Sequence, residues 1–450
     1  MGTRSNRNAV AATARTVAAQ VVERVLHDQA FAAAALDAEL DRAAQLQTRD
    51  KRLATELTYG TLRVRVLLEK RIGRHAPRGL KSVDHATLAH LLVASYQLLV
   101  LEKIPAFAAV SEAVDGVRAG RGEGMARFAN AVLRKLAHEV ETTGRVPLQQ
   151  AVVESVHPWL LSRIGQALGS VEQARDYVTA GPWPPAVCLR LRMREDRSSW
   201  LGRLAQEVDG AQVEAGRASP LCVCLQGAGQ VARLSGHGTH WIVQEEGSQV
   251  VGLALGARPT DRVLDACAGR GNKTTLLAEQ AHHGTVDAAD LYDAKLRTLR
   301  GQVEAMGGQL GASYGVDWSA GTGDVPEGYD RVLVDAPCSG IGTIRRRPDL
   351  LTRDLKGALP GLQQLQATVL AHAASRCRPG GRVVYSVCSV LQEEAEAVVE
   401  RARAQCPWLR PAPFDAPELV SLAGEATSLR LVPHVHGTDG YFVASLERTR

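Results

Sequence analysis

The most restrictive feature of this 450-residue chain is a regular alternation of strand and helix signals that begins near residue 236. Strands are expected at 262–265, 285–290, 312–316, 331–334, 382–386 and 440–446, with helices at 273–280, 294–306 and 362–377. Consecutive parallel strands need a long crossover connection, which is usually a helix. The alternation therefore predicts an α/β domain over residues 236–450, with helices covering both faces of a mainly parallel sheet.

Residues 1–144 follow a different pattern, in which apolar residues recur at helical intervals. Val17, Val21 and Val25 form one such stripe, and similar stripes follow as far as Leu136. The pattern predicts an all-α domain. Helix breaks are expected at Gly60, at 75–79 and at 116–124.

Residues 145–235 are expected to form a small α+β linking module. Strands are predicted at 187–192 and 221–225, with a helix at 200–208 between them. Cys222 and Cys224 alternate with apolar residues in the second strand, and free cysteine behaves as a small hydrophobe. Because the cysteines show no zinc-site spacing, no bound metal is expected.

The charge is distributed unevenly along the chain. Residues 1–140 contain 21 Lys/Arg and 14 Asp/Glu, a balance of +7, so a chain total of +5 leaves −2 for the remainder. A basic module on a nearly neutral body favours a polyanionic partner such as nucleic acid. A solvated, Arg-rich helical surface explains the charge equally well.

Composition also narrows the cellular setting. No apolar run approaches the ~18 residues that a membrane span needs, and the polar start of the chain does not resemble a signal peptide. The eight cysteines are scattered and are interpreted as free thiols in a reducing compartment. We therefore expect a cytoplasmic monomer without membrane contact.

Acidic residues end successive predicted strands, as the ligand-binding edge of an α/β sheet requires. A glycine-bearing turn follows the first strand and contains Cys267, Ala268, Gly269, Arg270, Gly271, Asn272 and Lys273. Asp290 is placed to accept hydrogen bonds from ribose hydroxyls, Asp317 from an adenine amino group, and Asp335 follows the fourth strand. Any one aspartate is explained by a cap or a turn, but the set predicts an S-adenosylmethionine (AdoMet) methyltransferase.

Two cysteines lie just after neighbouring predicted strands. Cys338 follows Asp335 in the stretch Asp335–Gly340, and Cys388 follows the strand at 382–386. Two such cysteines are often ordinary buried thiols, yet methylation of a pyrimidine at C5 needs this combination. A thiolate adds at C6 to make C5 nucleophilic, and an acid relieves the charge that develops on the ring.

Several short sequence motifs resemble those of known families. Segments 58–63, 96–99, 104–110 and 128–134 are similar to the NusB-type RNA-binding domain. Segments 335–340, 344–349, 385–389 and 437–442 resemble the RsmB/Sun (Fmu) ribosomal RNA methyltransferases, which carry such a domain. The turn at 267–274 departs from the family's Cys-Ala-Ala-Pro-Gly-Gly-Lys-Thr. Asn272 is expected to preserve its shape by tolerating a positive φ.

The resemblance implies a multidomain protein with a NusB-like domain (1–144), a linking module (145–235) and a Rossmann-like AdoMet methyltransferase domain (236–450). It implies Cys388 as nucleophile, Cys338 as the residue that assists product release, and Asp335 as acid. Lys273, Arg345, Arg346 and Arg347 are expected to contact RNA. The implied substrate is 16S rRNA or its small-subunit precursor, methylated at the cytosine conventionally numbered 967.

Two alternatives stay open. The same chemistry can act on transfer RNA or on 23S rRNA. In the other alternative, the chain is a non-catalytic, NusB-like RNA-binding assembly factor whose altered turn no longer binds AdoMet.

Overall fold

The computed structural model describes residues 12–181, 184–208, 210–228 and 231–449. The chain forms two compact units, residues 1–162 with 346–353 and residues 163–345 with 354–450. The polar start of the chain, residues 1–11, lies outside the described residues. Within the described ranges, no helix has both the length and the apolarity that a membrane crossing requires. The predicted three-part division at residues 144 and 235 stays a prediction.

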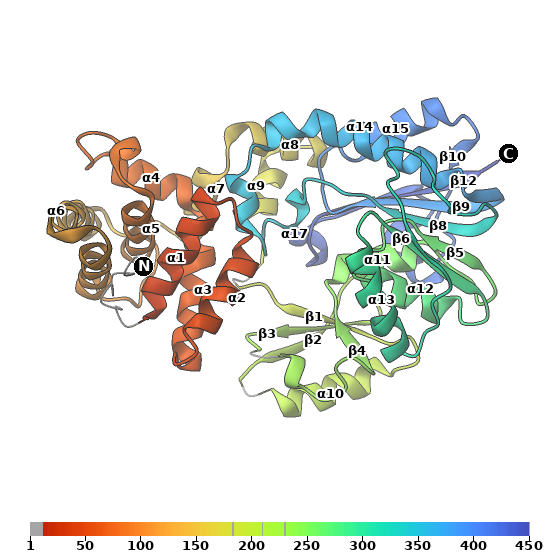
Figure 1. Cartoon of the computed structure of the whole chain (residues 1–450), viewed down its shortest axis with the longest axis horizontal. Helices are drawn as coiled ribbons and strands as arrows, with labels where there is room; N and C mark the ends of the chain where they lie inside the picture. The colour runs from red at the N-terminus through yellow and green to blue at the C-terminus, as the bar shows by residue number, and fades with distance from the viewer. Residues whose placement is uncertain (1–11, 182–183, 209, 229–230, 450) are drawn as a thin grey trace, which may run out of the picture. The chain divides into compact units, whose positions relative to one another are not determined.

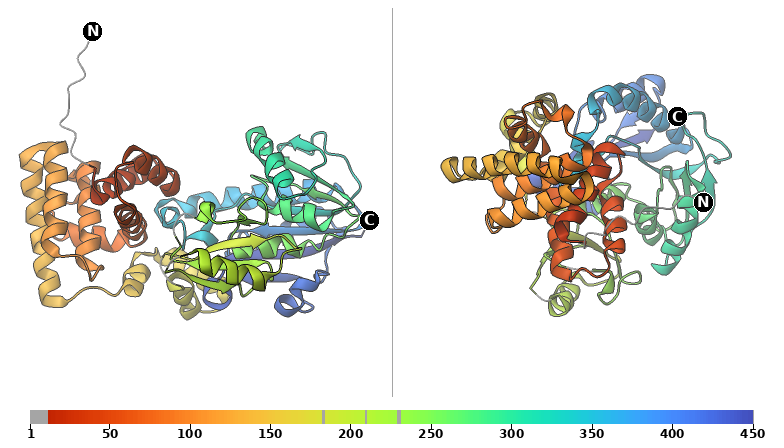
Figure 2. Two further views of the ribbon diagram at one scale, coloured as in Figure 1. Left: turned by 90° about the horizontal axis from the view of Figure 1, so that it is seen from below. Right: turned by 60° about the vertical axis from the view of Figure 1, so that its left-hand side comes forward.

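The first unit is built of helices, which confirms the all-α prediction for this region (Figure 2). They are α1 (Ala14–His27), α2 (Ala32–Arg42), α3 (Thr48–Arg63), α4 (Arg65–Gly73), α5 (His85–Leu99), α6 (Ala106–Thr143) and α7 (Leu148–Ser155), with short 3₁₀ turns at Leu80–Ser82 and Pro348–Thr352. Val17, Val21 and Val25 are buried on one face of α1, as their spacing predicts. The unit therefore owes its core to the apolar stripes seen in the sequence.

The glycines of this unit do not all break helices. Gly60 lies inside α3, where an added Cβ would meet the ring of Tyr96 at 2.2 Å, so the expected break at Gly60 is wrong. Gly60 is required by the close approach of α5 rather than by a turn. Gly122 does interrupt α6, with a φ of 79° that suits glycine.

The second unit begins with α8 (Pro158–Leu168, its first residues belonging to the first unit) and α9 (Val171–Thr179), followed by a small antiparallel sheet in the order β2-β3-β1-β4. The strands are β1 (Val187–Leu191), β2 (Gln212–Ala215), β3 (Cys222–Gln226) and β4 (Trp241–Val243). One face of this sheet packs on α10 (Arg197–Glu207) through Leu189, Val223, Trp200 and Leu204. The α+β character of this region is as predicted, although β2 and β4 were not.

A second, larger sheet forms the rest of the unit, in the order β10-β12-β9-β8-β5-β6-β7, with β11 paired to β12. The strands are β5 (Arg262–Asp265), β6 (Thr285–Asp290), β7 (Ser313–Gly315), β8 (Tyr329–Asp335), β9 (Cys377–Val387), β10 (Leu409–Pro411), β11 (Ser428–Leu431) and β12 (Tyr441–Arg448). Strands β5 to β9 run parallel, whereas β10, β11 and β12 pair antiparallel. The mainly parallel sheet is confirmed.

Helices cover both faces of this sheet (Figure 1). One face carries α14 (Leu355–Ala374) and α15 (Glu396–Gln405); the other carries α11 (Glu246–Ala254), α12 (Asn272–Gln280) and α13 (Asp293–Ala305). Short helices α16 (Val420–Ala423) and α17 (Pro433–His436) precede and follow β11. Val332 and Val334 join the core on one face and Leu333 joins the core on the other, because side chains alternate along a strand.

Candidate active site

The carboxyl ends of the parallel strands bring the predicted site residues to one edge of the sheet. Along this edge, Cys388 follows β9, Asp335 ends β8 and Asp265 ends β5. Further along, Asp290 ends β6 and Asp317 follows β7. Chain order reverses direction between β5 and β8, which makes this the topological switch point of the sheet. Ligands of open α/β sheets bind in the crevice that such a reversal leaves.

The two thiols face each other across this edge. The Sγ atoms of Cys338 and Cys388 lie 3.2 Å apart, and both side chains are partly exposed. The hydrogen bond with Cys388, together with burial, raises the pKa of Cys338 well above its usual value. Cys338 is therefore a protonated thiol in hydrogen-bond contact with the sulfur of Cys388.

Asp335 is held by two side chains from the neighbouring strands and turn. Lys273 Nζ donates to one carboxylate oxygen at 2.5 Å, and Ser386 Oγ donates to the other at 2.8 Å. Burial opposes the positive charge of Lys273, yet the nearby Asp335 carboxylate prevails and raises the lysine pKa. Asp335 is thus held in one orientation beside Lys273, with part of its surface open.

The loop that carries Cys338 is held by hydrogen bonds to Glu394, a buried acid that was not predicted from the sequence. Glu394 accepts hydrogen bonds from Ser339 N at 2.7 Å and Ser339 Oγ at 2.5 Å, and Gln366 Nε2 bridges Glu394 and the Pro337 carbonyl. Glu394 is fully buried. No sequence signal marked this residue, because it lies far from the loop along the chain.

The glycine turn keeps the backbone shape that a close ligand needs. Gly269 and Gly271 have φ values of 58° and 94°. Asn272, in contrast, is the first residue of α12 and has no positive φ. The expectation that Asn272 preserves the turn through a positive φ is wrong, because glycines already occupy the left-handed positions. The departure from the family pattern therefore leaves the turn intact.

Asp290 closes the turn against the next strand. Its Oδ2 accepts from Gly269 N at 2.9 Å, its Oδ1 accepts from Tyr292 N at 2.9 Å, and Lys295 Nζ lies 3.2 Å from Oδ1. Lys295 Nζ also lies 3.4 Å from Oδ2, so each carboxylate oxygen accepts from one backbone amide and shares the lysine. Asp317, after β7, is exposed and accepts from Ser319 N and Oγ.

Two further residues of the turn are buried groups. Burial raises the pKa of Asp265 to about 6, although Thr274 Oγ1 donates to its carboxylate at 2.7 Å. Burial likewise raises the pKa of Cys267 well above its usual value. Cys267 is therefore a neutral thiol that shapes the turn rather than a second nucleophile.

Comparison with known proteins identifies the family. Residues 252–447 match the family model for 16S rRNA methyltransferase RsmB/F, and residues 12–138 match the NusB family. The chain is 31% identical to a probable ribosomal RNA small subunit methyltransferase B of Bacillus subtilis, with 96% of this chain and 98% of the relative covered. The chain belongs to the RsmB/F family. A putative methyltransferase of Mycobacterium tuberculosis is 34% identical, with 97% of this chain and 96% of the relative covered.

Solved structures show the same fold. PH0851 superposes with a TM-score of 0.78 at 23% identity, covering 97% of this chain and 99% of that one. NSun6 from Pyrococcus horikoshii superposes with a TM-score of 0.56 at 18% identity, covering 66% of this chain and all of the other. At these identities the likeness supports the fold of the RsmB/F chain alone.

The arginines predicted to contact RNA have different environments in this RsmB/F chain. Arg345 is mostly buried and donates to the Gly437 carbonyl at 3.0 Å, with Asp439 at 3.5 Å. The guanidinium of Arg347 lies 5.3 Å from the Phe31 ring, whereas Arg346 is exposed. Arg346 is thus the best placed of the three to reach a phosphate, and Arg345 braces the segment that precedes β12.

Arg190, on β1 of the linking module, has no exposed surface. It donates to Gln244, Thr275 and Glu279 at 2.9, 2.8 and 2.7 Å. A buried ion pair of this kind ties the small sheet to α12. The strand arginine is therefore a structural link rather than an RNA contact.

Proposed function

We propose that this chain is an AdoMet-dependent RNA cytosine C5-methyltransferase that acts on 16S rRNA at the cytosine conventionally numbered 967. The observation that carries the proposal is the pair of thiols, Cys338 and Cys388, 3.2 Å apart beside the fixed carboxylate of Asp335. Methyl transfer to oxygen or to an exocyclic nitrogen has no use for two thiols. Transfer to C5 of a pyrimidine needs a thiolate and an acid at one ring.

The edge of the sheet suits AdoMet in this proposal. An added Cβ at Gly269 would meet no atom within 4 Å, so the turn is open on its ligand side. Ribose hydroxyls would bond to the Asp290 carboxylate in place of Lys295 Nζ, and the exposed side chains of Leu291 and Tyr292 offer an apolar surface beside it. Residues Cys267 to Lys273 would line the methionine end. When bound, AdoMet supplies an electrophilic methyl group.

Cys388 begins the reaction on the RNA base. Its thiolate adds to C6 of cytosine, forming a carbon–sulfur bond and moving an electron pair toward N3. The addition leaves C5 with enamine character, and therefore nucleophilic.

Asp335 and Lys273 act on the charge that the addition creates. In its protonated form the Asp335 carboxyl donates to N3, and Lys273, bonded to the same carboxylate, supplies a nearby positive charge. Ser386 fixes the orientation of Asp335, so the acid points at one place on the ring. The acid thus acts through position as much as through proton transfer.

Cys338 assists the release of product. After C5 has gained the methyl group, a base removes the C5 proton, the electron pair re-forms the C5–C6 double bond, and Cys388 leaves as a thiolate. Cys338 is suited to this step because its Sγ lies 3.2 Å from the sulfur that departs. N3 returns its proton to Asp335, the ring regains its aromaticity, and the acid and the nucleophile are back in their starting forms.

Surfaces outside the carboxyl edge of the sheet bind the RNA in this proposal. The NusB-family region carries the excess of positive charge, and Arg346 is exposed next to the loop of Cys338 in sequence. Phosphate contacts of this kind position a substrate without reading its sequence. The target base must be unstacked to reach the thiols, as enzymes that modify a base require.

The test is bisulfite sequencing of total RNA from a strain that lacks the gene, together with methyl transfer by the purified protein to 16S rRNA. We expect loss of one 16S signal and its return when the wild-type gene is restored. A lost signal in transfer RNA or 23S rRNA would reassign the substrate and keep the chemistry. Absence of AdoMet binding in calorimetry at millimolar cofactor would reject the enzyme and favour the assembly factor.

A further inference from the structure

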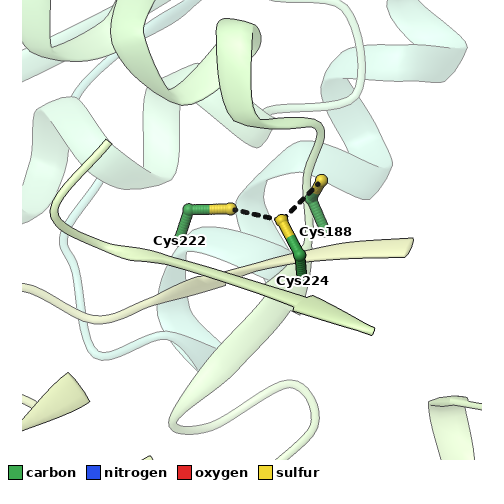
Figure 3. A group of neighbouring side chains, drawn as sticks. All are labelled: Cys188, Cys222 and Cys224. Atoms are coloured by element: carbon green, nitrogen blue, oxygen red, sulfur yellow. Dashed lines mark hydrogen bonds between the residues drawn. The ribbon is translucent and has the colours of Figure 1, made fainter. Parts of the chain in front are cut away.

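Three cysteines of the linking module converge at one point on the small sheet (Figure 3). The Sγ atoms of Cys188 and Cys224 lie 3.5 Å apart, and those of Cys222 and Cys224 lie 3.7 Å apart. All three sulfurs fall within 4.8 Å of one another. In the part of the chain that the structure describes, these three cysteines form the one group of His, Cys, Asp or Glu side chains with donor atoms close enough to hold a metal ion.

The register of the sheet explains the convergence. Cys188 of β1 pairs directly with Cys224 of β3, and Cys222 lies two residues earlier on the same strand. Side chains at directly paired positions, and at alternate positions along one strand, point to the same face of a sheet. The three thiols therefore project together from one face.

This face is not the one that holds the sheet's own core. The buried cluster beneath the sheet consists of Leu189, Val223 and Leu225 with residues of α10, and these alternate with the cysteines. The cysteines lie on the opposite face, beside the start of α11. Cys188 and Cys222 are buried there, as small hydrophobes would be, but they are not part of the cluster that packs on α10.

The spacing of the sulfurs matches a tetrahedral metal site. A Zn–S bond of about 2.3 Å places two sulfurs of a tetrahedron about 3.8 Å apart. The distances of 3.5 and 3.7 Å therefore need little adjustment. A disulfide would instead bring two sulfurs to about 2.05 Å and leave the third thiol alone.

The surroundings give an ion both access and a fourth position. Cys188 and Cys224 line a cavity of about 580 Å³, together with Glu214, Glu246 and His434. Glu246 Oε1 already accepts from the amides of Ala218 and Ser219, at 2.6 and 2.9 Å. Water from the cavity that Cys188 and Cys224 line can reach a fourth position. Glycine at position 216 is needed for this packing, since a Cβ there would lie 2.4 Å from both Cys222 Cβ and Glu246 Oε1.

We propose that Cys188, Cys222 and Cys224 bind one Zn²⁺ ion, with water from the adjoining cavity as the fourth ligand. The three thiols lose their protons to solvent on binding, so uptake releases up to three protons. Three thiolates select a thiophilic cation over Mg²⁺ or Ca²⁺. The ion ties β1 to β3 next to α11. This inference stands independently of the proposed methyl transfer.

The test is metal binding by the full chain, stripped with a chelator and kept reduced. Zn²⁺ is titrated against a chromophoric chelator, and native mass spectrometry counts the ions. We expect one Zn²⁺ per chain, and Co²⁺ should give sulfur-to-metal charge-transfer absorption. Cys224→Ser should lose the ion and the absorption. Circular dichroism reports whether that variant is folded, and Cys188→Ser provides a second variant if it is not.

Two matched variants locate the ion. Cys406→Ser removes a buried cysteine elsewhere and should keep full binding. The double variant Cys338→Ser/Cys388→Ser removes the other close pair of thiols and should also keep it. Failure of the wild-type chain to take up Zn²⁺, equal uptake by folded Cys224→Ser, or loss of uptake in the double variant would each overturn the proposal.

Discussion

Lys273 Nζ donates a hydrogen bond to Asp335 Oδ2 across 2.5 Å and thereby joins the glycine turn after β5 to the acid at the end of β8. The turn is proposed to hold the cofactor, and Asp335 is proposed to act on the base. One ion pair therefore couples the two halves of the proposed site. The predictions below separate the contributions of the residues around it.

The first prediction concerns the nucleophile. Cys388→Ser should abolish methyl transfer while leaving AdoMet affinity within about twofold, because a serine hydroxyl stays protonated near neutral pH and has nearly the size of the thiol that it replaces. Single-turnover assays and calorimetry measure the two effects. Activity retained at the wild-type rate would move the nucleophile to Cys338.

The second prediction concerns release. Cys338→Ser should accumulate a covalent protein–RNA adduct, because Cys388 still adds to the base but its departure is impaired. A denaturing gel with labelled RNA shows the adduct as a slow band. The double variant with Cys388→Ser is the control and should show no such band; a band there would place the bond at another residue.

The third prediction concerns the acid. Asp335→Asn should lower kcat by about 10²–10³-fold, the range seen on removing one proton-transfer group or one oriented charge. The fold should be unchanged, since the amide can still accept from Ser386. Lys273→Met should lower kcat less and also raise the KM for AdoMet, because Lys273 belongs to the turn. Equal kinetics for wild type and Asp335→Asn would remove Asp335 from the acid role.

The fourth prediction follows from the buried Asp265, whose pKa is raised from 3.8 to about 6 by burial. A carboxyl with a raised folded-state pKa binds its proton more tightly in the folded protein, so its contribution to stability falls as pH rises from about 4 to about 6. The shift corresponds to at most about 3 kcal/mol. Asp265→Asn should flatten this part of the pH dependence in urea unfolding. An identical pH profile for the two proteins would contradict the assignment.

The fifth prediction tests a helix contact. Gly60→Ala should destabilise the protein by about 1–3 kcal/mol, because the new methyl group overlaps the Tyr96 ring and forces repacking. Gly120→Ala, in α6, is the matched control. Its Cβ meets nothing within 4 Å, so it should stabilise by about 0.5–1 kcal/mol through helix propensity. Thermal unfolding of both variants distinguishes overlap from propensity.

Local features of the sequence predicted the parallel strands β5 to β9 and the strand β12, but they did not predict β10, β11 or α11. Helix α14 shows the limit of that reading, because it begins at Leu355 rather than near residue 362. Asp354 caps it by accepting from Gly357 N at 3.0 Å. Pro360 lies within the helix, and a proline at that position disguises a helix start in the sequence. Element ends depend on such individual bonds, whereas the elements themselves depend on periodicity.

The sequence by itself determined the alternation of strands and helices and the residues that end each strand. Periodicity and the order of elements along the chain can both be read from local stretches of sequence. It therefore placed Cys338, Cys388 and Asp335 at one edge. Only the tertiary structure decided that Lys273 pairs with Asp335, that Glu394 holds the loop of Cys338, and that Cys188 joins Cys222 and Cys224. These contacts join residues far apart in sequence, and their partners are selected by sheet register and close packing, which no local pattern encodes.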